Sequence, residues 1–271
     1  MAFSVSELPR LLTSTFADTL YRPFLDAMQA YSLVQTGDRV AVCISGGKDS
    51  MLLAKLMQLY QQEHPDFELH MLVMDPGYSP ANRRQIEQNL KLLEIPATID
   101  QSDIFSIADE TPRNPCYLCA RMRRGFLYSR AQRLGCNKIA LGHHLNDVIE
   151  TTVMGMFYGA QLQAMMPKLR SKNFEGMELI RPLYRIREQD ILAWRDAFGL
   201  RFLQCACRLT ERAAMEDEIM TSKRKETKLL LAELMTTDPA IEQHVFSAIH
   251  TADPSALPGW KNRSGEHTLQ R

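Results

Sequence analysis

Three short segments carry residues whose chemistry is recognisable before any fold is considered. Residues 45–50 read SGGKDS, residues 116–119 read CYLC, and residues 142–147 read GHHLND. A second cysteine pair, in the sequence CAC, occupies residues 205–207. Glycines beside a lysine and hydroxyls suit a phosphate group, whereas paired thiols suit a metal or redox site. The chain therefore carries the residue types of both a nucleotide site and a metal or redox centre.

The first segment has the composition of a loop that binds a nucleotide together with Mg²⁺. It departs from the Walker A order G-x-x-x-x-G-K-[ST], because Lys48 is followed by Asp49 and no glycine stands five positions before Gly47. Asp49 would repel a phosphate unless a metal ion lay between them, which favours a metal–nucleotide as the ligand. The alternative is a tight turn without a ligand. We predict that the phosphates are held by Ser45, Gly46, Gly47, Lys48 and Ser50, and that Asp49 holds Mg²⁺.

The cysteine pairs admit more than one centre. Cys116 and Cys119 begin a predicted helix, where the helix dipole favours thiolates. With both Cys205 and Cys207 they would form a closed four-thiolate site suited to structural Zn²⁺. With only one of the late cysteines, a three-cysteine site would leave a metal position open for chemistry. A redox pair is a third interpretation of CxxC.

The third segment follows a predicted strand and opens a helix, which predicts that its side chains lie at the carboxyl edge of a sheet. His143 and His144 cannot both face one way, and we expect a nucleotide or Mg²⁺ role for at least one of them, with a structural histidine as the alternative. We assign Gly142 and His143 to the nucleotide site. Asp75 stands just past the second predicted strand, which covers residues 69–74. It positions the nucleotide or is simply the first residue of the turn Asp75-Pro76-Gly77.

Alternating strands and helices surround these segments. Short apolar runs predict strands, and longer runs with apolar residues at helical spacing predict helices. The predicted strands cover residues 40–44, 69–74, 97–99 and 138–141, and the predicted helices cover residues 51–60, 83–93, 118–134 and 148–158. This alternation predicts an α/β fold: an open parallel sheet with helices on both faces.

The remaining segments suggest a division of the chain. We predict an N-terminal helical segment over residues 1–35, an α/β domain with the cysteine site over residues 36–207, and a C-terminal helical tail over residues 208–253. Residues 161–176 are polar and basic and predict a mobile loop, and residues 254–271 are predicted to be poorly ordered.

Charge and composition limit the partners. The 271 residues include 32 Lys and Arg and 32 Asp and Glu, so a nucleic acid would have to be held by local patches. No apolar run reaches the length of a membrane span, and with six cysteines we expect a cytoplasmic protein with thiols or metal ligands. The candidate RNA-binding residues are Arg121, Arg123 and Arg124 beside the cysteine pair, with Lys168 and Arg170 on the predicted loop. Solvated helix faces are the alternative for these charges.

Longer stretches resemble a known family. The S-G-G-x-D-S segment resembles the pyrophosphate loop of the N-type ATP pyrophosphatases, the PP-loop superfamily. The segments CYLCARMRRGFLY, LGHHLNDVIET, MFYGAQLQAMMPKL and IRPLYRIREQDI resemble successive motifs of the TtcA family, the tRNA 2-thiocytidine synthetases. The resemblance runs from about Tyr31 to Cys205, roughly two thirds of the chain.

This resemblance implies an ATP- and Mg²⁺-dependent sulfurtransferase with an adenine nucleotide alpha hydrolase-like fold. It would adenylate the C2 oxygen of the cytidine at position 32 of tRNA and replace it with sulfur, with Lys48 and Asp49 as catalytic residues. Carried over by position, Cys116, Cys119 and Cys205 would hold a 4Fe-4S cluster, with Cys207 as the alternative third ligand. The implied partners are tRNA, a sulfur donor (a cysteine desulfurase or sulfide) and a second copy of the chain in a homodimer.

Three departures from the family pattern keep two other functions open. The late cysteines form CAC where the family has CxxC in a Pro-Cys context, Asn146 stands where the family has Asp, and the tail from Arg208 does not follow the family. One alternative keeps the cluster chemistry but takes another RNA or a small molecule as acceptor. The other is a nucleotide-binding module with structural Zn²⁺ on all four paired cysteines.

Overall fold

A computed structural model describes residues 3–111, 115–203, 223–262 and 265–268. The chain divides into two compact units. Unit 1 comprises residues 1–147 and 166–220, and unit 2 comprises residues 148–165 and 221–271. The phosphate-loop segment and the third chemical segment both belong to unit 1.

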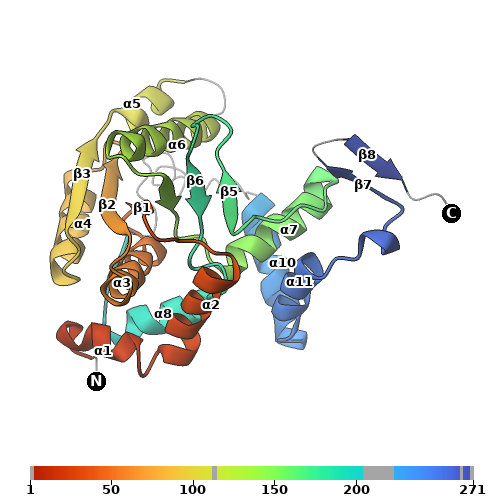
Figure 1. The fold of residues 1–271 in the computed structure, drawn as a ribbon, viewed down its shortest axis with the longest axis horizontal. Helices are drawn as coiled ribbons and strands as arrows, with labels where there is room; N and C mark the ends of the chain where they lie inside the picture. The colour runs from red at the N-terminus through yellow and green to blue at the C-terminus, as the bar shows by residue number, and fades with distance from the viewer. Residues whose placement is uncertain (1–2, 112–114, 204–222, 263–264, 269–271) are drawn as a thin grey trace. The chain divides into compact units, whose positions relative to one another are not determined.

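Unit 1 is built on a six-stranded sheet with the order β3-β2-β1-β4-β6-β5. Every neighbouring pair is parallel except β5–β6, which is antiparallel. The strands are β1 (Arg39–Ile44), β2 (Glu68–Asp75), β3 (Ala97–Gln101), β4 (Lys138–Ala140), β5 (Lys168–Arg170) and β6 (Glu178–Ile180). The sheet is therefore the predicted open, mostly parallel sheet with one antiparallel edge strand (Figure 1).

The sequence of β1 explains its central place in the sheet. All its residues after Arg39 are buried, as is usual for a parallel strand covered on both faces. Val42 pairs with Met71 of β2 on one side and with Ala140 of β4 on the other. The loop that follows β1 consequently lies at the middle of the carboxyl edge, where ligands of open α/β sheets bind.

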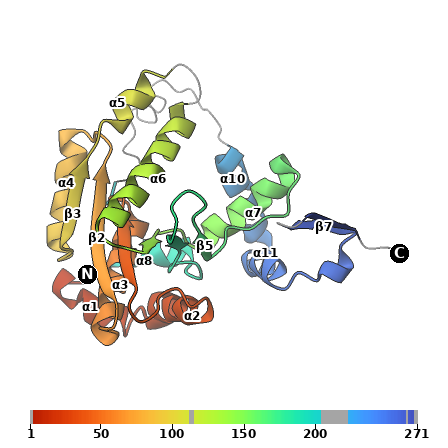
Figure 2. The ribbon, with the colours of Figure 1, turned by 45° about the horizontal axis from the view of Figure 1, so that its top comes forward.

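Helices cover both faces of this sheet (Figure 2). α3 packs against β1, β2 and α8 on one face, and α6 packs against β2 and β4 on the other. The helical elements of unit 1 are η1 (Val5–Glu7), α1 (Leu8–Leu12), the π-helical η2 (Ala17–Tyr21), α2 (Arg22–Ala30), α3 (Lys48–Glu63), α4 (Pro80–Leu92), α5 (Ile104–Asp109), α6 (Pro115–Arg133) and α8 (Glu188–Ala197). The N-terminal helical segment is thus divided into several short pieces.

Unit 2 contains most of α7 (Leu145–Gly159), whose first residues belong to unit 1. Its other elements are α10 (Lys223–Thr237), α11 (Ile241–His250), η3 (Pro254–Ala256), β7 (Gly259–Asn262) and β8 (Gly265–Thr268). Arg224 of α10 donates a 2.9 Å hydrogen bond to the buried carboxylate of Glu150, and the Tyr158 hydroxyl donates one of 3.0 Å to Glu226. Ion pairs and hydrogen bonds therefore join α7 to α10.

Most predicted elements are found within a few residues of their expected bounds. One prediction needs correction: the segment predicted as a loop over residues 161–176 contains β5, because Lys168 to Arg170 pair antiparallel with β6. In the part of the tail that the structure describes, Pro254–Ala256 form η3, and β7 pairs with β8 through contacts such as Trp260↔His267. The poor order of residues 254–271 and the boundary at residue 207 remain predictions, although residues 148–165 group with the tail in one compact unit.

Candidate functional site

The phosphate-binding loop predicted from the sequence lies between β1 and α3, and its backbone requires glycine. Gly46 has a φ of +85°, which side-chain-bearing residues rarely adopt. A Cβ atom at Gly46 would also lie 2.7 Å from Cγ1 of Ile86. Gly47 is the N-cap of α3, so the first N–H groups of the helix are directed toward the loop.

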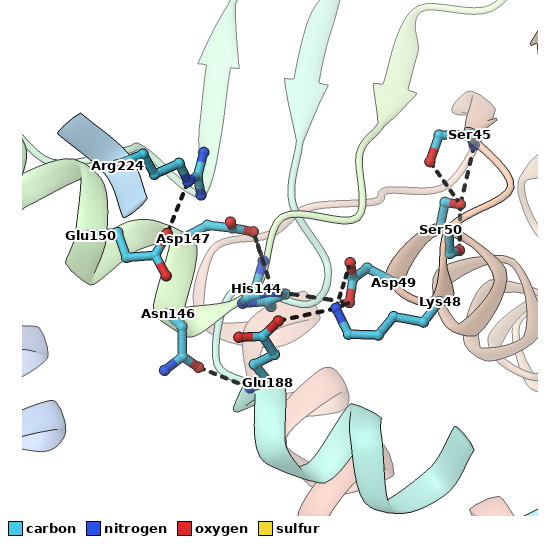
Figure 3. A network of polar contacts seen from close by, with 11 residues as sticks. Ser45, Lys48, Asp49, Ser50, His144, Asn146, Asp147, Glu150, Glu188 and Arg224 are labelled. Carbon is cyan, nitrogen blue, oxygen red and sulfur yellow. Dashed lines mark hydrogen bonds and ion pairs between the residues drawn. The ribbon is translucent and has the colours of Figure 1, made fainter. Parts of the chain in front are cut away.

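The two serines of the loop stabilise its shape (Figure 3). The buried Ser50 hydroxyl accepts hydrogen bonds from the Ser45 backbone N–H (3.1 Å) and the Ser45 hydroxyl (3.2 Å), and donates one to the Gly47 carbonyl oxygen (2.9 Å). Ser50 is therefore engaged within the loop, and its predicted contact with ATP remains a prediction.

Lys48 lies between two carboxylates from different parts of the chain (Figure 3). Its Nζ is 3.0 Å from Oδ1 of Asp49 and 3.1 Å from Oε1 of Glu188, the first residue of α8. Burial alone would lower the pKa of Lys48, but the two carboxylates outweigh burial and raise the pKa above its ordinary value. Glu188 lies in the quoted segment IRPLYRIREQDI, but its pairing with Lys48, 140 residues away, could not be predicted from the sequence.

The two consecutive histidines face different surroundings. The imidazole of His144 is buried, with Nε2 3.6 Å from Oδ2 of Asp147 and 3.9 Å from Oδ1 of Asp49. The His144 backbone N–H also donates to Oδ2 of Asp147 (2.9 Å). His143 instead lines a cavity beside the phosphate loop. The predicted divergence of the two side chains is confirmed, and the assignment of His143 to ATP stays a prediction.

Gly142 allows β4 to end directly against the first turn of α3. A Cβ atom there would lie 3.0 Å from the Asp49 carbonyl carbon and 3.1 Å from the Ser50 nitrogen, both of which are backbone atoms. Any side chain at residue 142 would therefore push the phosphate loop and the third chemical segment apart. The structure brings these two segments together, as expected from their positions after neighbouring strands.

Two cavities adjoin the phosphate loop and share Ser45, Asp49 and Arg123. The smaller cavity, of about 450 Å³, lies over the strand ends and is lined by apolar side chains together with Gly142 and His143. The larger cavity, of about 1110 Å³, is lined on its other side by aromatic and charged residues, including Tyr78, Phe105, Glu188, Arg195, Arg201 and Phe202. Both volumes are adequate for small-molecule ligands.

Asp75 is the last residue of β2, and its side chain holds the turn that follows. Its buried carboxylate accepts hydrogen bonds from the backbone N–H groups of Gly77 (2.9 Å) and Tyr78 (2.7 Å) and pairs with Arg83 at 2.7 Å. Burial would raise its pKa, but these donors hold it below the ordinary value. The geometry thus favours the turn interpretation of Asp75. The turn positions Tyr78, whose hydroxyl donates to the Ser45 carbonyl oxygen (3.2 Å).

Of the four paired cysteines, only Cys119 has a described side chain. It is buried beside Met74, Ile104 and Phe105, and it is close enough to Tyr78 to influence the pKa of that hydroxyl. The Cys116 side chain, Cys205 and Cys207 lie outside the described residues, so the predicted ligand set remains a prediction. Among the side chains that the structure does describe, no group of three His, Cys, Asp or Glu residues could hold a metal ion. Leu203, just before the late pair, donates its backbone N–H to the Gly46 carbonyl oxygen (3.2 Å).

The predicted RNA-binding residues do not form one surface. Arg123 lines both cavities and Arg124 lines the smaller one, whereas Arg121 is simply exposed on α6. Lys168 and Arg170 lie 3.5 Å from the carboxylate of Glu178, the first residue of β6. Glu178 starts its strand at the amino edge of the sheet, opposite the phosphate loop. The structure therefore does not bring Lys168 and Arg170 to the cavities.

Comparisons with known proteins agree with this geometry. Residues 16–219 match the PP-loop domain family. The tRNA-cytidine(32) 2-sulfurtransferase of Anaeromyxobacter dehalogenans (strain 2CP-C) is 36% identical over 242 residues, which cover 88% of this chain and 80% of that protein. The protein of the same name from Syntrophotalea carbinolica is 34% identical over 235 residues, covering 85% and 88%.

A solved structure with a similar fold is the U34-tRNA thiolase NcsA from Methanococcus maripaludis, determined with its [4Fe-4S] cluster. It superposes with a TM-score of 0.68 at 20% identity, over 90% of this chain and 85% of NcsA. At that identity the likeness supports the fold of the chain. None of the described helices is long and apolar enough to cross a membrane.

Proposed function

Since the chain belongs to the PP-loop family and, within it, to the tRNA-cytidine(32) 2-sulfurtransferases, we propose that it is an ATP-dependent enzyme that thiolates a tRNA cytidine. The observation that carries the proposal is the phosphate loop between two cavities that share Ser45, Asp49 and Arg123. A reaction between ATP and a second nucleotide needs two adjoining sites that meet at the α-phosphate. The acceptor is cytidine 32 of tRNA, the nucleotide named in the relatives.

We assign ATP to the smaller cavity and its phosphates to the loop. Gly46 and Gly47 leave room for close approach of phosphate to the backbone, and Lys48 contributes a cation beside the start of α3. The Asp49 carboxylate lies beside the loop, with Oδ1 3.0 Å from Nζ of Lys48, and a carboxylate at this place is a ligand type that Mg²⁺ prefers. Bound there, Mg²⁺ would supply positive charge for the phosphates.

The chemistry follows from the poor leaving ability of the C2 oxygen. That oxygen attacks the α-phosphorus of ATP, the bond to the β-phosphate oxygen breaks, and pyrophosphate departs. Lys48 stabilises the negative charge that develops on the pyrophosphate, an effect usually worth about 10²- to 10³-fold in rate for one such donor. Sulfur then attacks C2, and the oxygen leaves with AMP.

The sulfur-carrying centre is proposed to be a 4Fe-4S cluster on Cys116, Cys119 and Cys205, with Cys207 as the alternative third ligand. When bound, the cluster supplies an iron that can hold the incoming sulfur. Support within the described residues comes from Cys119, near Tyr78 at the larger cavity, and from Leu203, which is hydrogen-bonded to the phosphate loop just before Cys205. The Cys119 side chain lies on the buried side of α6, and solvent exposure is one of the factors that set the potential of an iron–sulfur cluster.

The larger cavity is the proposed site for the acceptor nucleotide. Tyr78 and Phe202 supply aromatic surfaces, and Arg195 and Arg201 supply cations at its wall, the residue types that hold unstacked bases and phosphates. The side chain of Arg201 is suited to a test, because the Arg201 carbonyl oxygen is held independently by Asn89 Nδ2 (2.9 Å).

The enzymatic test measures 2-thiocytidine in an unmodified tRNA transcript after incubation with anaerobically purified protein, ATP, Mg²⁺ and a sulfur source. The sulfur source is sulfide, or a cysteine desulfurase with cysteine. We expect product with cytidine at position 32 and none when that nucleotide is uridine. Colourless protein that carries stoichiometric zinc and forms no product would overturn the proposal in favour of a nucleotide-binding module.

The ligand assignment is tested with Cys205→Ala and Cys207→Ala separately. If Cys205 is the third ligand, its replacement removes the broad absorption near 400 nm expected of a thiolate-ligated cluster, and Cys207→Ala retains that absorption. The reverse result would transfer the role to Cys207.

The acceptor site is tested by the affinity for the same transcript. We expect Arg201→Ala to weaken tRNA binding several-fold and to leave ATP binding unchanged. The matched control is Arg170→Ala, which removes an exposed arginine at the opposite edge of the sheet. Weaker binding with Arg170→Ala alone would move the RNA site to that edge.

A further inference from the structure

Glu188 lies in the segment IRPLYRIREQDI, but no role was assigned to it from the sequence. Its Oε1 accepts a 3.1 Å hydrogen bond from Nζ of Lys48, and its carboxylate lines the larger cavity. Asp49 also pairs with Lys48, but the two are consecutive residues of the first turn of α3. Glu188 comes from a different element, so it is the partner that can select where the Lys48 side chain points (Figure 3).

The position of Glu188 is fixed by contacts on the backbone of its own segment. Its backbone N–H donates to Oδ1 of Asn146 (2.8 Å), and Ile186 accepts a hydrogen bond from the Leu145 backbone N–H (2.9 Å). Behind it, Ile191 and Trp194 bury α8, which packs against α3. The carboxylate is therefore presented to Lys48 by a rigid frame that does not depend on the ion pair.

The pair itself is accessible to a competing anion. The side chains of Lys48 and Glu188 retain 18% and 20% of their exposure, and both face the larger cavity beside the loop. A phosphate that binds to the loop would interact with the Lys48 ammonium group, which Glu188 already binds. Because both are anions, each phosphate contact with Lys48 must be made against the attraction of the Glu188 carboxylate.

We propose that Glu188 is a positioning residue that holds Lys48 over the loop in the nucleotide-free protein and competes with the phosphates for it, thereby weakening ATP binding and speeding the release of pyrophosphate. This inference rests on the proposed ATP site. It assigns to Glu188 a role in the adenylation half of the reaction, in which an over-stable complex with pyrophosphate would delay the arrival of sulfur.

A purely structural tie between α3 and α8 makes the opposite prediction. If the ion pair only joined the helices, its loss would loosen the loop and weaken ATP binding. If Glu188 competes with phosphate, its neutralisation strengthens ATP binding. The sign of the change in affinity therefore separates the two roles.

The experiment measures ATP binding directly by calorimetry on tRNA-free protein, with Mg²⁺ and with EDTA, for wild type, Glu188→Gln and Glu188→Ala. We expect Glu188→Gln to bind ATP about 3- to 10-fold more tightly, the range for a partly exposed charge-assisted pair. Glu188→Ala should also bind ATP more tightly than wild type, which would show that the effect does not come from the amide group of the introduced Gln. The matched control is Glu87→Gln, which neutralises an exposed carboxylate that pairs with Arg83 outside both cavities.

ATP–pyrophosphate exchange, measured with the unmodified tRNA transcript present as acceptor, gives a second readout. For Glu188→Gln we expect a lower KM for both ATP and pyrophosphate. The kcat for 2-thiocytidine formation should be lower, because release of pyrophosphate becomes slower. Affinity that is unchanged or weaker in both variants would overturn the proposal, whatever the change in stability. Wild-type protein that binds no ATP would overturn the proposed function, and this inference with it.

Discussion

Two lysines at opposite edges of one sheet have almost the same charged neighbours and contrasting surroundings. Lys48 lies between Asp49 and Glu188 at the carboxyl edge, and Lys138 lies between Asp38 and Glu178 at the amino edge. The Lys138 side chain is 3% exposed, whereas that of Lys48 is 18% exposed. A lysine beside two carboxylates is therefore a structural group when its N–H donors are all buried and hydrogen-bonded, as in Lys138. It can bind a ligand when its side chain lines a cavity, as in Lys48.

The saturation of Lys138 is visible atom by atom. Its Nζ lies 2.6 Å from Oδ2 of Asp38 and donates to the Leu33 carbonyl oxygen (2.9 Å). Asp38 in turn accepts hydrogen bonds from Nδ2 of Asn137 (2.7 Å) and the Gln35 backbone N–H (2.6 Å). This network joins the start of β1 to the start of β4 and to the chain before β1. The network therefore fixes the positions of these strands relative to one another at the amino edge of the sheet.

The largest effect is expected when this buried network loses its cation. Lys138→Met leaves Asp38 buried without its counter-ion, a change that costs about 3–5 kcal/mol of folding stability. The free energy of unfolding, measured with urea, should fall by that amount. The double variant Lys138→Met with Asp38→Asn should recover part of the loss, since it removes the uncompensated charge. A loss below about 1 kcal/mol in the single variant would erase the contrast between the two lysines.

Removal of Lys48 should have a small effect on stability and a large effect on activity. Lys48→Ala should change the free energy of unfolding by less than about 1 kcal/mol, because water in the cavity solvates the remaining carboxylates. The rate of ATP–pyrophosphate exchange should fall about 10²- to 10³-fold. Near-wild-type exchange would remove Lys48 from the proposed reaction, and a large loss of stability would make it a structural lysine like Lys138.

A smaller effect on stability is expected when the close packing of Gly142 against the first turn of α3 is disturbed. Gly142→Ala places a methyl group about 3.0 Å from backbone atoms of the phosphate loop, which can move only by displacing α3 or β4. Overpacking of this kind costs about 1–3 kcal/mol, and ATP affinity should fall as the loop is displaced. The matched control is Gly125→Ala on α6, where a Cβ atom meets nothing within 4 Å and alanine favours the helix. Equal stability of the two variants would contradict the packing argument.

The part of the site that could be predicted from sequence is the part encoded by adjacent residues. Residues 45–50 are consecutive, so their types and order indicated their role without knowledge of the fold. Glu188 could not be predicted, because its proximity to Lys48 depends on how α8 packs against α3. Asp75 was ambiguous for the same reason: only the structure gives the Arg83 contact that completes its turn network.

The fold shows a similar division. The parallel strands were predicted well, since burial on both faces produces continuous apolar runs such as that of β1. β5 was missed because it is a three-residue edge strand in which polar residues are tolerated, so Leu169 is its only apolar residue. Lys168 and Arg170 of this strand lie beside Glu178. Their positive charge was therefore not enough to predict a shared surface with the arginines of α6.

The smallest effect is expected from pH, because it acts only in acid. Burial alone would raise the pKa of Asp38, but its bonds to Lys138, Asn137 and Gln35 outweigh burial and hold the pKa below the ordinary value. The unfolded chain therefore binds the proton more readily, so Asp38 stabilises the fold fully above about pH 4 and loses that contribution as pH falls through its folded pKa. Urea unfolding of wild type and Asp38→Asn should show a stability gap at pH 7 that narrows as the pH is lowered from about 5 to 3. A gap that stays constant over this range would mean that Asp38 is not held ionised by its partners, and the amino-edge network would then owe its stability to packing alone.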